Sequence, residues 1–141
     1  MSSDWAKKCL GDYCEKIGSG ATPEGGKDAY LSSGPVYLIR SQNVHNDRFS
    51  PAGLAYISDE QAQKLGNVKV ESGDILLNIT GDSVARVCQA LKRFLPARVN
   101  QHVAIIRPMA SVFDARYLRY FFASPAQQNF MLGLAAVGAT R

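Results

Sequence analysis

The sequence of 141 residues lacks a long apolar run and a secretion signal. Its longest apolar-rich stretch, Asn129–Val137, is far shorter than the ~20 residues that a membrane-spanning helix needs. No apolar segment follows Lys7 and Lys8, as it would in a signal peptide. We therefore expect a soluble, cytoplasmic protein without a membrane partner.

Cysteine and histidine are also scarce. The cysteines, Cys9, Cys14 and Cys88, are odd in number, which favours free thiols in a reducing compartment over a disulfide framework. Cys9 and Cys14 do not have the spacing of a structural zinc pair, and His45 and His102 are distant in sequence. We expect no metal and no cofactor in this chain.

Enzyme motifs are missing as well. Gly81–Ala85 resembles a nucleophile elbow around Ser83, but Asp114 follows His102, which reverses the chain order of that hydrolase class. No Glu-x-Lys and no GxGxxG motif is present, so nuclease and dinucleotide-binding constellations have no candidate. We expect no catalytic residues, with a hydrolase that uses Ser83 as a minor alternative.

The apolar pattern predicts an α+β fold. Short β-prone runs at 36–39, 75–79 and 102–106 are bounded by turn residues and predict strands, whereas Gly11–Gly26 is rich in glycine and predicts a loop. Ser58 and Gln61 form a capping box for a short helix that ends near Gly66. Asp114 and Ser124 are N-cap residues for a C-terminal pair of helices. Strands followed by helices are typical of α+β proteins.

The stretch Val84–Leu95 is ambiguous. Its apolar residues have helical spacing, but it directly follows a strand and the turn-forming residues Gly81–Ser83. The spacing alone favours a helix, and the turn favours a hairpin.

Basic residues are concentrated in one part of the chain. The formal net charge of the whole sequence is +4, but the window from Arg86 to Arg119 holds seven basic residues and one acid, Asp114, for a charge of +6. A basic stretch on a nearly neutral body suggests a polyanionic partner. A solvated surface would give the same count.

Polar residues of the kinds that read DNA gather at predicted loops. Arg, Asn and Gln form paired hydrogen bonds with the edges of guanine and adenine, and Lys and Arg bind phosphates. The candidates for base contacts are Arg40, Gln42, Asn43, Asp82, Ser83 and Arg86, and those for phosphate contacts are Lys92, Arg93 and Arg98. Asn100 and Gln101 precede the third strand and His102 begins it; the role of these three residues is either structural or functional.

Five segments occur in an order that carries a resemblance to a known family. They are Gly20–Pro23, Tyr37–Val44, Gly73–Gly81, Asn100–Pro108 and Gly138–Arg141. Together they resemble the target recognition domain of the DNA specificity subunit of type I restriction-modification enzymes.

The resemblance implies a strongly curved, mostly antiparallel sheet with short helices, and a loop surface that reads one half of a split target in double-stranded DNA. It implies a non-catalytic component that directs methyltransferase (M) subunits and restriction-motor (R) subunits. S-adenosylmethionine, ATP and Mg would then be held by those partners. It also implies that the chain returns as a strand within Val84–Leu95. We adopt this expectation in place of the helix that the apolar spacing favours.

Two departures from the family pattern stand out. The family commonly has glycine where Ala85 stands, so the hairpin tolerates this residue only if its φ is negative. The linking helix that follows the domain in the family is absent, so residues 1–141 are either a fragment of a longer subunit or a half-subunit. We expect one recognition domain, and the start at Met1 favours the N-terminal one of a longer subunit.

A second function remains open. The aromatic residues Tyr117, Tyr120, Phe121 and Phe130 are suited to a protein interface, where aromatic side chains are enriched. On this alternative the chain docks a methyltransferase or an inhibitor without reading DNA itself.

Overall fold

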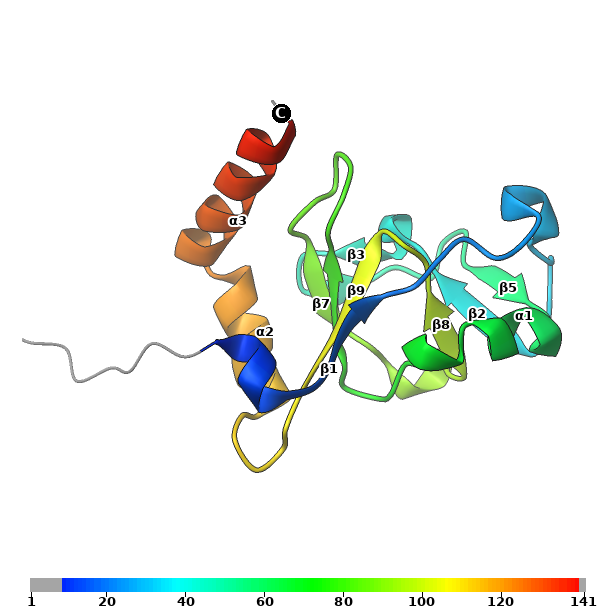
Figure 1. The fold of residues 1–141 in the computed structure, drawn as a ribbon, viewed down its shortest axis with the longest axis horizontal. Helices are drawn as coiled ribbons and strands as arrows, with labels where there is room; N and C mark the ends of the chain where they lie inside the picture. Colours follow the sequence, from blue (N-terminus) through cyan, green and yellow to red (C-terminus); the bar gives the residue numbers. More distant parts are fainter. Residues whose placement is uncertain (1–8, 140–141) are drawn as a thin grey trace, which may run out of the picture.

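The computed structural model describes residues 9–139, which form an α+β fold as predicted (Figure 1). The strands are β1 (Cys14–Ser19), β2 (Val36–Ile39), β3 (Val44–His45), β4 (Arg48–Phe49), β5 (Ala55–Ile57), β6 (Ile75–Asn78), β7 (Val87–Gln89), β8 (Ala97–Val99) and β9 (Val103–Pro108). The α-helices are α1 (Asp59–Lys64), α2 (Ala115–Ala123) and α3 (Pro125–Ala139). Short 3-10 helices are η1 (Leu10–Tyr13), η2 (Gly26–Ala29), η3 (Ser41–Asn43), η4 (Gly66–Val68) and η5 (Lys92–Phe94).

The strands are divided between three small sheets. The largest has the order β1-β9-β6-β7 and is antiparallel throughout. The second has the order β5-β2-β8, in which β2 and β8 run parallel, and β3 and β4 form a hairpin of their own. The pairing is thus mostly antiparallel, as expected.

The four-stranded sheet is apolar on both faces. Neighbouring residues of a strand point to opposite sides, so Leu76 joins the core shared with β2, β5 and β8, and Ile75 joins the core beneath α2. On β9, Ile105 and Ile106 are separated in the same way. Full burial of such a side chain contributes about 1.5–3 kcal/mol to folding. The two most apolar runs of the sequence are therefore central strands.

The predicted helix caps are present. Ser58 and Gln61 exchange side-chain to backbone hydrogen bonds of 2.8 and 3.1 Å at the start of α1. Asp114 accepts a hydrogen bond of 2.8 Å from the backbone N–H of Arg116 at the start of α2. The hydroxyl of Ser124 accepts one of 3.3 Å from the backbone N–H of Gln127 in α3. These polar side chains satisfy N–H groups that have no partner within a helix.

The stretch after β6 returns as the strand β7, so the hairpin is confirmed and the helical spacing of Val84–Leu95 is overruled. The expected backbone of Ala85 was wrong. Its φ is +76°, a conformation usually taken by glycine, and the residue is buried. The hairpin thus accepts alanine at the cost of an unfavourable backbone conformation.

The glycine-rich N-terminal stretch holds a strand that the sequence did not predict. Residues Cys14–Ser19 form β1 and pair with β9. Gly20, which follows β1, lies so close to β8 that an added Cβ would be 1.8 Å from the carbonyl oxygen of Val99. Glycine at this position therefore reflects a close approach between two backbones and not a flexible loop.

The C-terminal helices lie on one side of the sheets, and α3 extends away from the body beside the loop that joins β6 to β7 (Figure 1). Among residues 9–139, no helix has both the length and the apolar character needed to cross a bilayer. The last two residues of the segment Gly138–Arg141 lie outside the described residues.

Candidate functional site

An open hollow with a volume of about 500 Å³ collects polar side chains from three parts of the chain. The loop after β2 contributes Gln42, the loop between β6 and β7 contributes Asp82, Ser83 and Arg86, and His102 comes from the turn before β9. The remaining lining residues are Ser41, Thr80 and Gly81. Four of the six residues proposed to contact bases are thus brought together, although they are separated by up to 44 positions in sequence.

Asn78, at the end of β6, ties the two loops of the hollow together. Its side-chain nitrogen donates hydrogen bonds of 3.0 Å to the carbonyl of Ser41 and 3.0 Å to the hydroxyl of Ser83. The carbonyl of Val44 lies 3.4 Å away from the same nitrogen. Asn78 is 1% exposed and its amide oxygen has no partner among the described residues, so it supports the loops from below.

Sequence reasoning missed the role of Asn78. The signal was present, because this is the one polar residue in the apolar run Ile75–Ile79. A buried amide in such a position needs hydrogen-bond partners, and only neighbouring loops can supply them once the strand ladder is complete.

His102 lines the hollow and is held in place by hydrogen bonds to three neighbouring residues. The ring nitrogen Nδ1 of His102 is hydrogen-bonded to the hydroxyl of Thr80. Its backbone carbonyl accepts a bond of 3.0 Å from the N–H of Ile79, and its N–H donates to the side chain of Asn100 at 3.0 Å. Asn100 is buried, so at least this member of the Asn100–His102 segment has a structural role.

Arg40 and Asn43 are not among the residues that line the hollow. Asn43 is fully buried, and its side-chain nitrogen donates to the carbonyls of Ser50 and Ala52 at 2.9 and 3.3 Å. The Arg40 guanidinium donates to the carbonyl of Gly53 at 2.6 Å and lies over the ring of Tyr30. Both side chains hold the first loop in place, and Asn43 has no surface with which to touch a base.

Of the three candidates for phosphate contacts, one is buried and two are exposed. Arg98 lies on β8, is 9% exposed, and donates to the carbonyls of Ala62 and Ala97 at 3.2 and 3.1 Å. Burial lowers the pKa of its guanidinium. Lys92 and Arg93 are exposed on η5, but β7 leads away from the hollow, so they lie at the opposite end of the β6–β7 hairpin.

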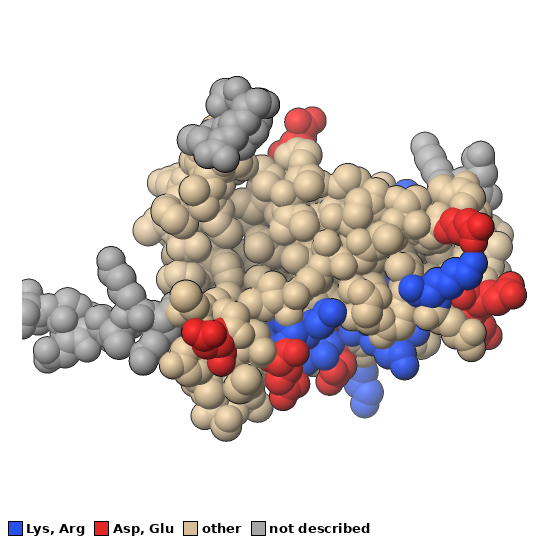
Figure 2. All heavy atoms as spheres, viewed as in Figure 1, with Lys and Arg blue, Asp and Glu red and all other residues tan. Residues whose placement is uncertain are grey.

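The basic window from Arg86 to Arg119 does not form one positive surface. Three of its members have acidic partners: Arg107 with Asp74 and Glu71, Arg116 with Asp114, and Arg119 with Asp47. On the face drawn in Figure 2, basic and acidic side chains are mixed along the lower edge. Arg86 lines the hollow and has no ion pair among the described residues.

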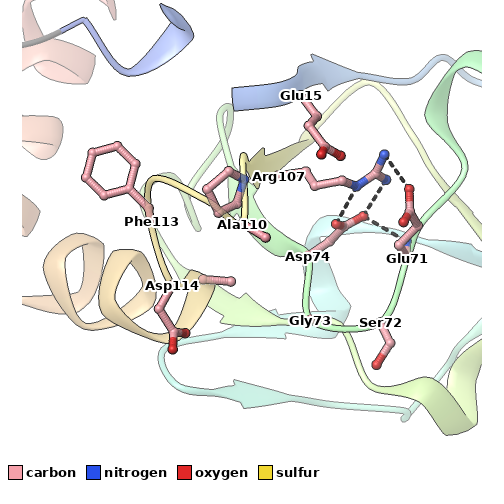
Figure 3. A pocket seen from close by; sticks show the side chains of 11 residues that line it. Glu15, Glu71, Ser72, Gly73, Asp74, Arg107, Ala110, Phe113 and Asp114 are labelled. Carbon is pink, nitrogen blue, oxygen red and sulfur yellow. Dashed lines mark hydrogen bonds and ion pairs between the residues drawn. The ribbon is translucent and has the colours of Figure 1, made fainter. Parts of the chain in front are cut away.

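A second hollow, of about 420 Å³, is dominated by carboxylates (Figure 3). Arg107 forks onto the buried Asp74 with two hydrogen bonds of 2.8 Å and reaches Glu71 at 2.6 Å. The hydrogen bonds with Asp74 raise the pKa of Arg107, to which the negative charges of Glu71 and Glu15 add. The lining of this hollow holds four acids and one cation, so the hollow would repel a phosphate.

The geometry does not support the hydrolase alternative. Among the described residues, the hydroxyl of Ser83 is hydrogen-bonded to Asn78 and Nδ1 of His102 is hydrogen-bonded to Thr80, so no hydrogen bond joins Ser83 to His102 as a nucleophile and its base would require. Residues 9–139 also contain no group of three or more His, Cys, Asp or Glu side chains that could hold a metal ion.

The C-terminal helices expose large apolar side chains. Tyr117, Tyr120 and Phe130 are each about 60% exposed, and Phe121 is 44% exposed. An apolar groove of about 310 Å³ separates Met131, Leu134 and Ala135 of α3 from the loop between β6 and β7. The residues on the loop side are Leu77, Asn78, Ile79, Val84 and Ala85.

The sequence and the structure were compared with known proteins. No protein-family model and no curated protein matches the sequence. The structure is similar to the crystal structure of the HsdS subunit from Thermoanaerobacter tengcongensis, with a TM-score of 0.57 and 15% sequence identity. The similarity covers 84% of this chain and 30% of the HsdS chain, so the domain spans about a third of that protein's length. At this identity the likeness shows a shared fold.

Proposed function

We propose that this chain is a DNA target recognition domain that reads one half of a split site in double-stranded DNA. The observation that carries the proposal is the hollow, which unites Gln42, Asp82 and Arg86 from two separate loops. The likeness to an HsdS subunit and the ordered sequence segments support it. On this proposal the domain is a non-catalytic part of a type I restriction-modification complex.

The side chains of the hollow have complementary abilities. Arg86 can donate two hydrogen bonds to the O6 and N7 of guanine, Gln42 can pair with the N6 and N7 of adenine, and Asp82 can accept from the N4 of cytosine. Because Asp82 and Arg86 carry opposite charges, the hollow disfavours indiscriminate binding to phosphates alone. We assign base contacts to Gln42, Asp82, Ser83 and Arg86, and loop support to Arg40, Asn43 and Arg98.

The partners follow from the same proposal. Methyltransferase subunits with S-adenosylmethionine, and restriction-motor subunits with ATP and Mg, would act on DNA that this domain selects. Lys92 and Arg93 remain the proposed phosphate contacts, at a distance from the hollow that a bound duplex would have to bridge. The domain would then serve as one of two recognition domains in a longer subunit.

The test is selection followed by titration. Duplexes selected from a random pool by the purified chain are compared with scrambled duplexes by fluorescence anisotropy, from about 50 to about 200 mM salt. We expect affinity to fall as salt rises, since phosphate contacts release counterions, and the selected duplex to bind at least about 10-fold tighter than the scrambled one. Equal affinity for both duplexes, or binding that ignores salt, would refute the proposal.

The exposed aromatic residues of α2 and α3 favour a second candidate function, a protein-docking module for a methyltransferase subunit or an inhibitor. Apolar docking survives high salt, whereas DNA binding does not. Retention of a methyltransferase subunit at high salt, lost on Tyr120→Ala, together with no DNA binding, would favour this candidate over the first.

A further inference from the structure

Gln128 of α3 connects the C-terminal helices to the loop that borders the hollow. Its side-chain nitrogen donates a hydrogen bond of 2.8 Å to the carbonyl of Ala85 and another of 2.8 Å to the carbonyl of Phe122 at the end of α2. Both N–H bonds of the amide are therefore used, one on the loop and one on the neighbouring helix.

The carbonyl that Gln128 holds belongs to an unfavourable backbone. The N–H of Arg86 donates to the carbonyl of Ser83 at 3.2 Å, which makes Ala85 the third residue of a tight turn. A positive φ at this place of a turn is usual for glycine or asparagine, and Ala85 has φ +76°. Such a conformation persists only where surrounding contacts hold it.

The residue that follows this turn is Arg86, whose side chain lines the hollow. If φ of Ala85 were negative, the peptide group between Ala85 and Arg86 would be rotated. The side chain of Arg86 would then point away from the hollow. The direction of Arg86 thus depends on the conformation that the Gln128 amide supports.

The link between α3 and the loop is otherwise apolar and open. Met131, Leu134 and Ala135 face the loop across the groove described above. Within residues 9–139, the bond from Gln128 to Ala85 is the one hydrogen bond between α3 and the loop 79–86. Because a hydrogen bond is directional and apolar contacts are not, this bond fixes the position of the loop relative to α3 more closely than the contacts across the groove.

We propose that Gln128 is a positioning residue, which holds the Ser83–Arg86 turn in the conformation that directs Arg86 into the hollow. Its consequence for DNA recognition rests on the proposed function. Through this bond, the position of α3 is coupled to the geometry of the reading loop.

The first experiment needs no DNA. Amide hydrogen exchange is measured by NMR in the 141-residue chain for the wild type, Gln128→Ala and Gln127→Ala. Gln127 is the matched control, because it lies on the same helix and its side chain makes no hydrogen bond among the described residues. We expect exchange at the N–H groups of Ala85 and Arg86 to accelerate at least about 10-fold in Gln128→Ala alone, with exchange at Ile105 unchanged.

A second substitution that rescues Gln128→Ala distinguishes a role in the conformation of the turn from a general role in stability. The double variant Gln128→Ala/Ala85→Gly should regain slow exchange at Arg86, since glycine takes a positive φ without strain. For DNA, the ratio of affinities for selected and scrambled duplexes should fall at least about 5-fold in Gln128→Ala and recover in the double variant.

The two proposals fail separately. If exchange at Arg86 is unchanged in Gln128→Ala, or if Gln127→Ala has the same effect, the positioning role is overturned whether or not the wild type binds DNA. If the wild type does not discriminate between duplexes, the proposed function fails, and the exchange and rescue results alone then support or overturn the role of Gln128 in the turn.

Discussion

The side-chain nitrogen of Asn78 donates a hydrogen bond of 3.0 Å to the hydroxyl oxygen of Ser83. Asn78 is 1% exposed and lies at the end of β6, whereas Ser83 lies in a surface loop. The same nitrogen reaches the carbonyl of Ser41 in the other loop of the hollow. One buried amide therefore sets the relative position of two surface loops, which makes it the first residue to test.

Asn78→Leu keeps the size of the side chain and removes its hydrogen bonds. The carbonyl of Ser41 and the hydroxyl of Ser83 would each lose this donor, at a combined cost of about 1–3 kcal/mol in the free energy of unfolding. Urea unfolding measures this loss. Asn67→Leu is the control, because Asn67 is exposed on η4 and should change stability by less than about 0.5 kcal/mol. Equal effects of the two substitutions would contradict the support role of Asn78.

Arg86→Ala tests the proposed base contact. A paired contact to guanine contributes about 1–3 kcal/mol of discrimination, so the ratio of affinities for selected and scrambled duplexes should fall about 5- to 150-fold. Arg116→Ala is the control, since Arg116 is exposed and already paired with Asp114. If Arg86→Ala weakens binding to both duplexes equally, Arg86 contacts a phosphate and not a base.

Lys92→Ala and Arg98→Met test whether the exposed cation contacts DNA phosphate and the buried one supports the fold. Loss of one phosphate contact should reduce the slope of log affinity against log salt by about 0.9, which we expect for Lys92→Ala. Arg98→Met should leave the slope unchanged and lower the free energy of unfolding by about 1–3 kcal/mol, because the hydrogen bonds from the guanidinium to the carbonyls of Ala62 and Ala97 are lost. A reduced slope in Arg98→Met would show that this side chain reaches DNA after all.

Cys88 should make stability depend on alkaline pH. Burial raises the pKa of its thiol from 9.0 to about 12, so above pH 9 the unfolded chain loses this proton while the folded protein keeps it. Stability is therefore full below pH 9 and falls as pH rises towards 12. At pH 10 the loss is about 1.4 kcal/mol.

Urea unfolding at pH 8 and pH 10 of the wild type and Cys88→Val isolates this contribution. The other alkaline groups, such as tyrosines and lysines, are common to both proteins and cancel in the comparison. The valine variant should lose less stability than the wild type between the two pH values. The same loss in both would mean that the thiol ionises freely in the folded protein.

The elements that could be predicted from sequence are those with local causes. The capping residues Ser58, Asp114 and Ser124 act within one helical turn, and the apolar runs Ile75–Leu77 and Val103–Ile106 mark β6 and β9. β1 was missed because it is held by its pairing with β9, more than 80 positions away, and not by its own composition.

The candidate site was predicted in part for a similar reason. The loops of Gln42, Asp82 and Arg86 could be identified from polar residues at strand ends, but residue type alone does not tell which side chains face solvent. Asn43 and Arg98 have the same chemistry as the lining residues and are buried. Burial depends on the distant carbonyls that these side chains meet, such as those of Ala52 and Ala62, and these contacts exist only in the folded chain.

The split between buried supports and exposed lining residues has an engineering consequence. Asn43 and Asn78 maintain the loop backbones from inside the fold, so Gln42, Asp82 and Arg86 can be exchanged without removing any of those supports. A library randomised at these three surface positions, with both asparagines retained, would keep the scaffold and vary its chemistry. On the proposed function, such a library is a direct route to domains that select new DNA half-sites.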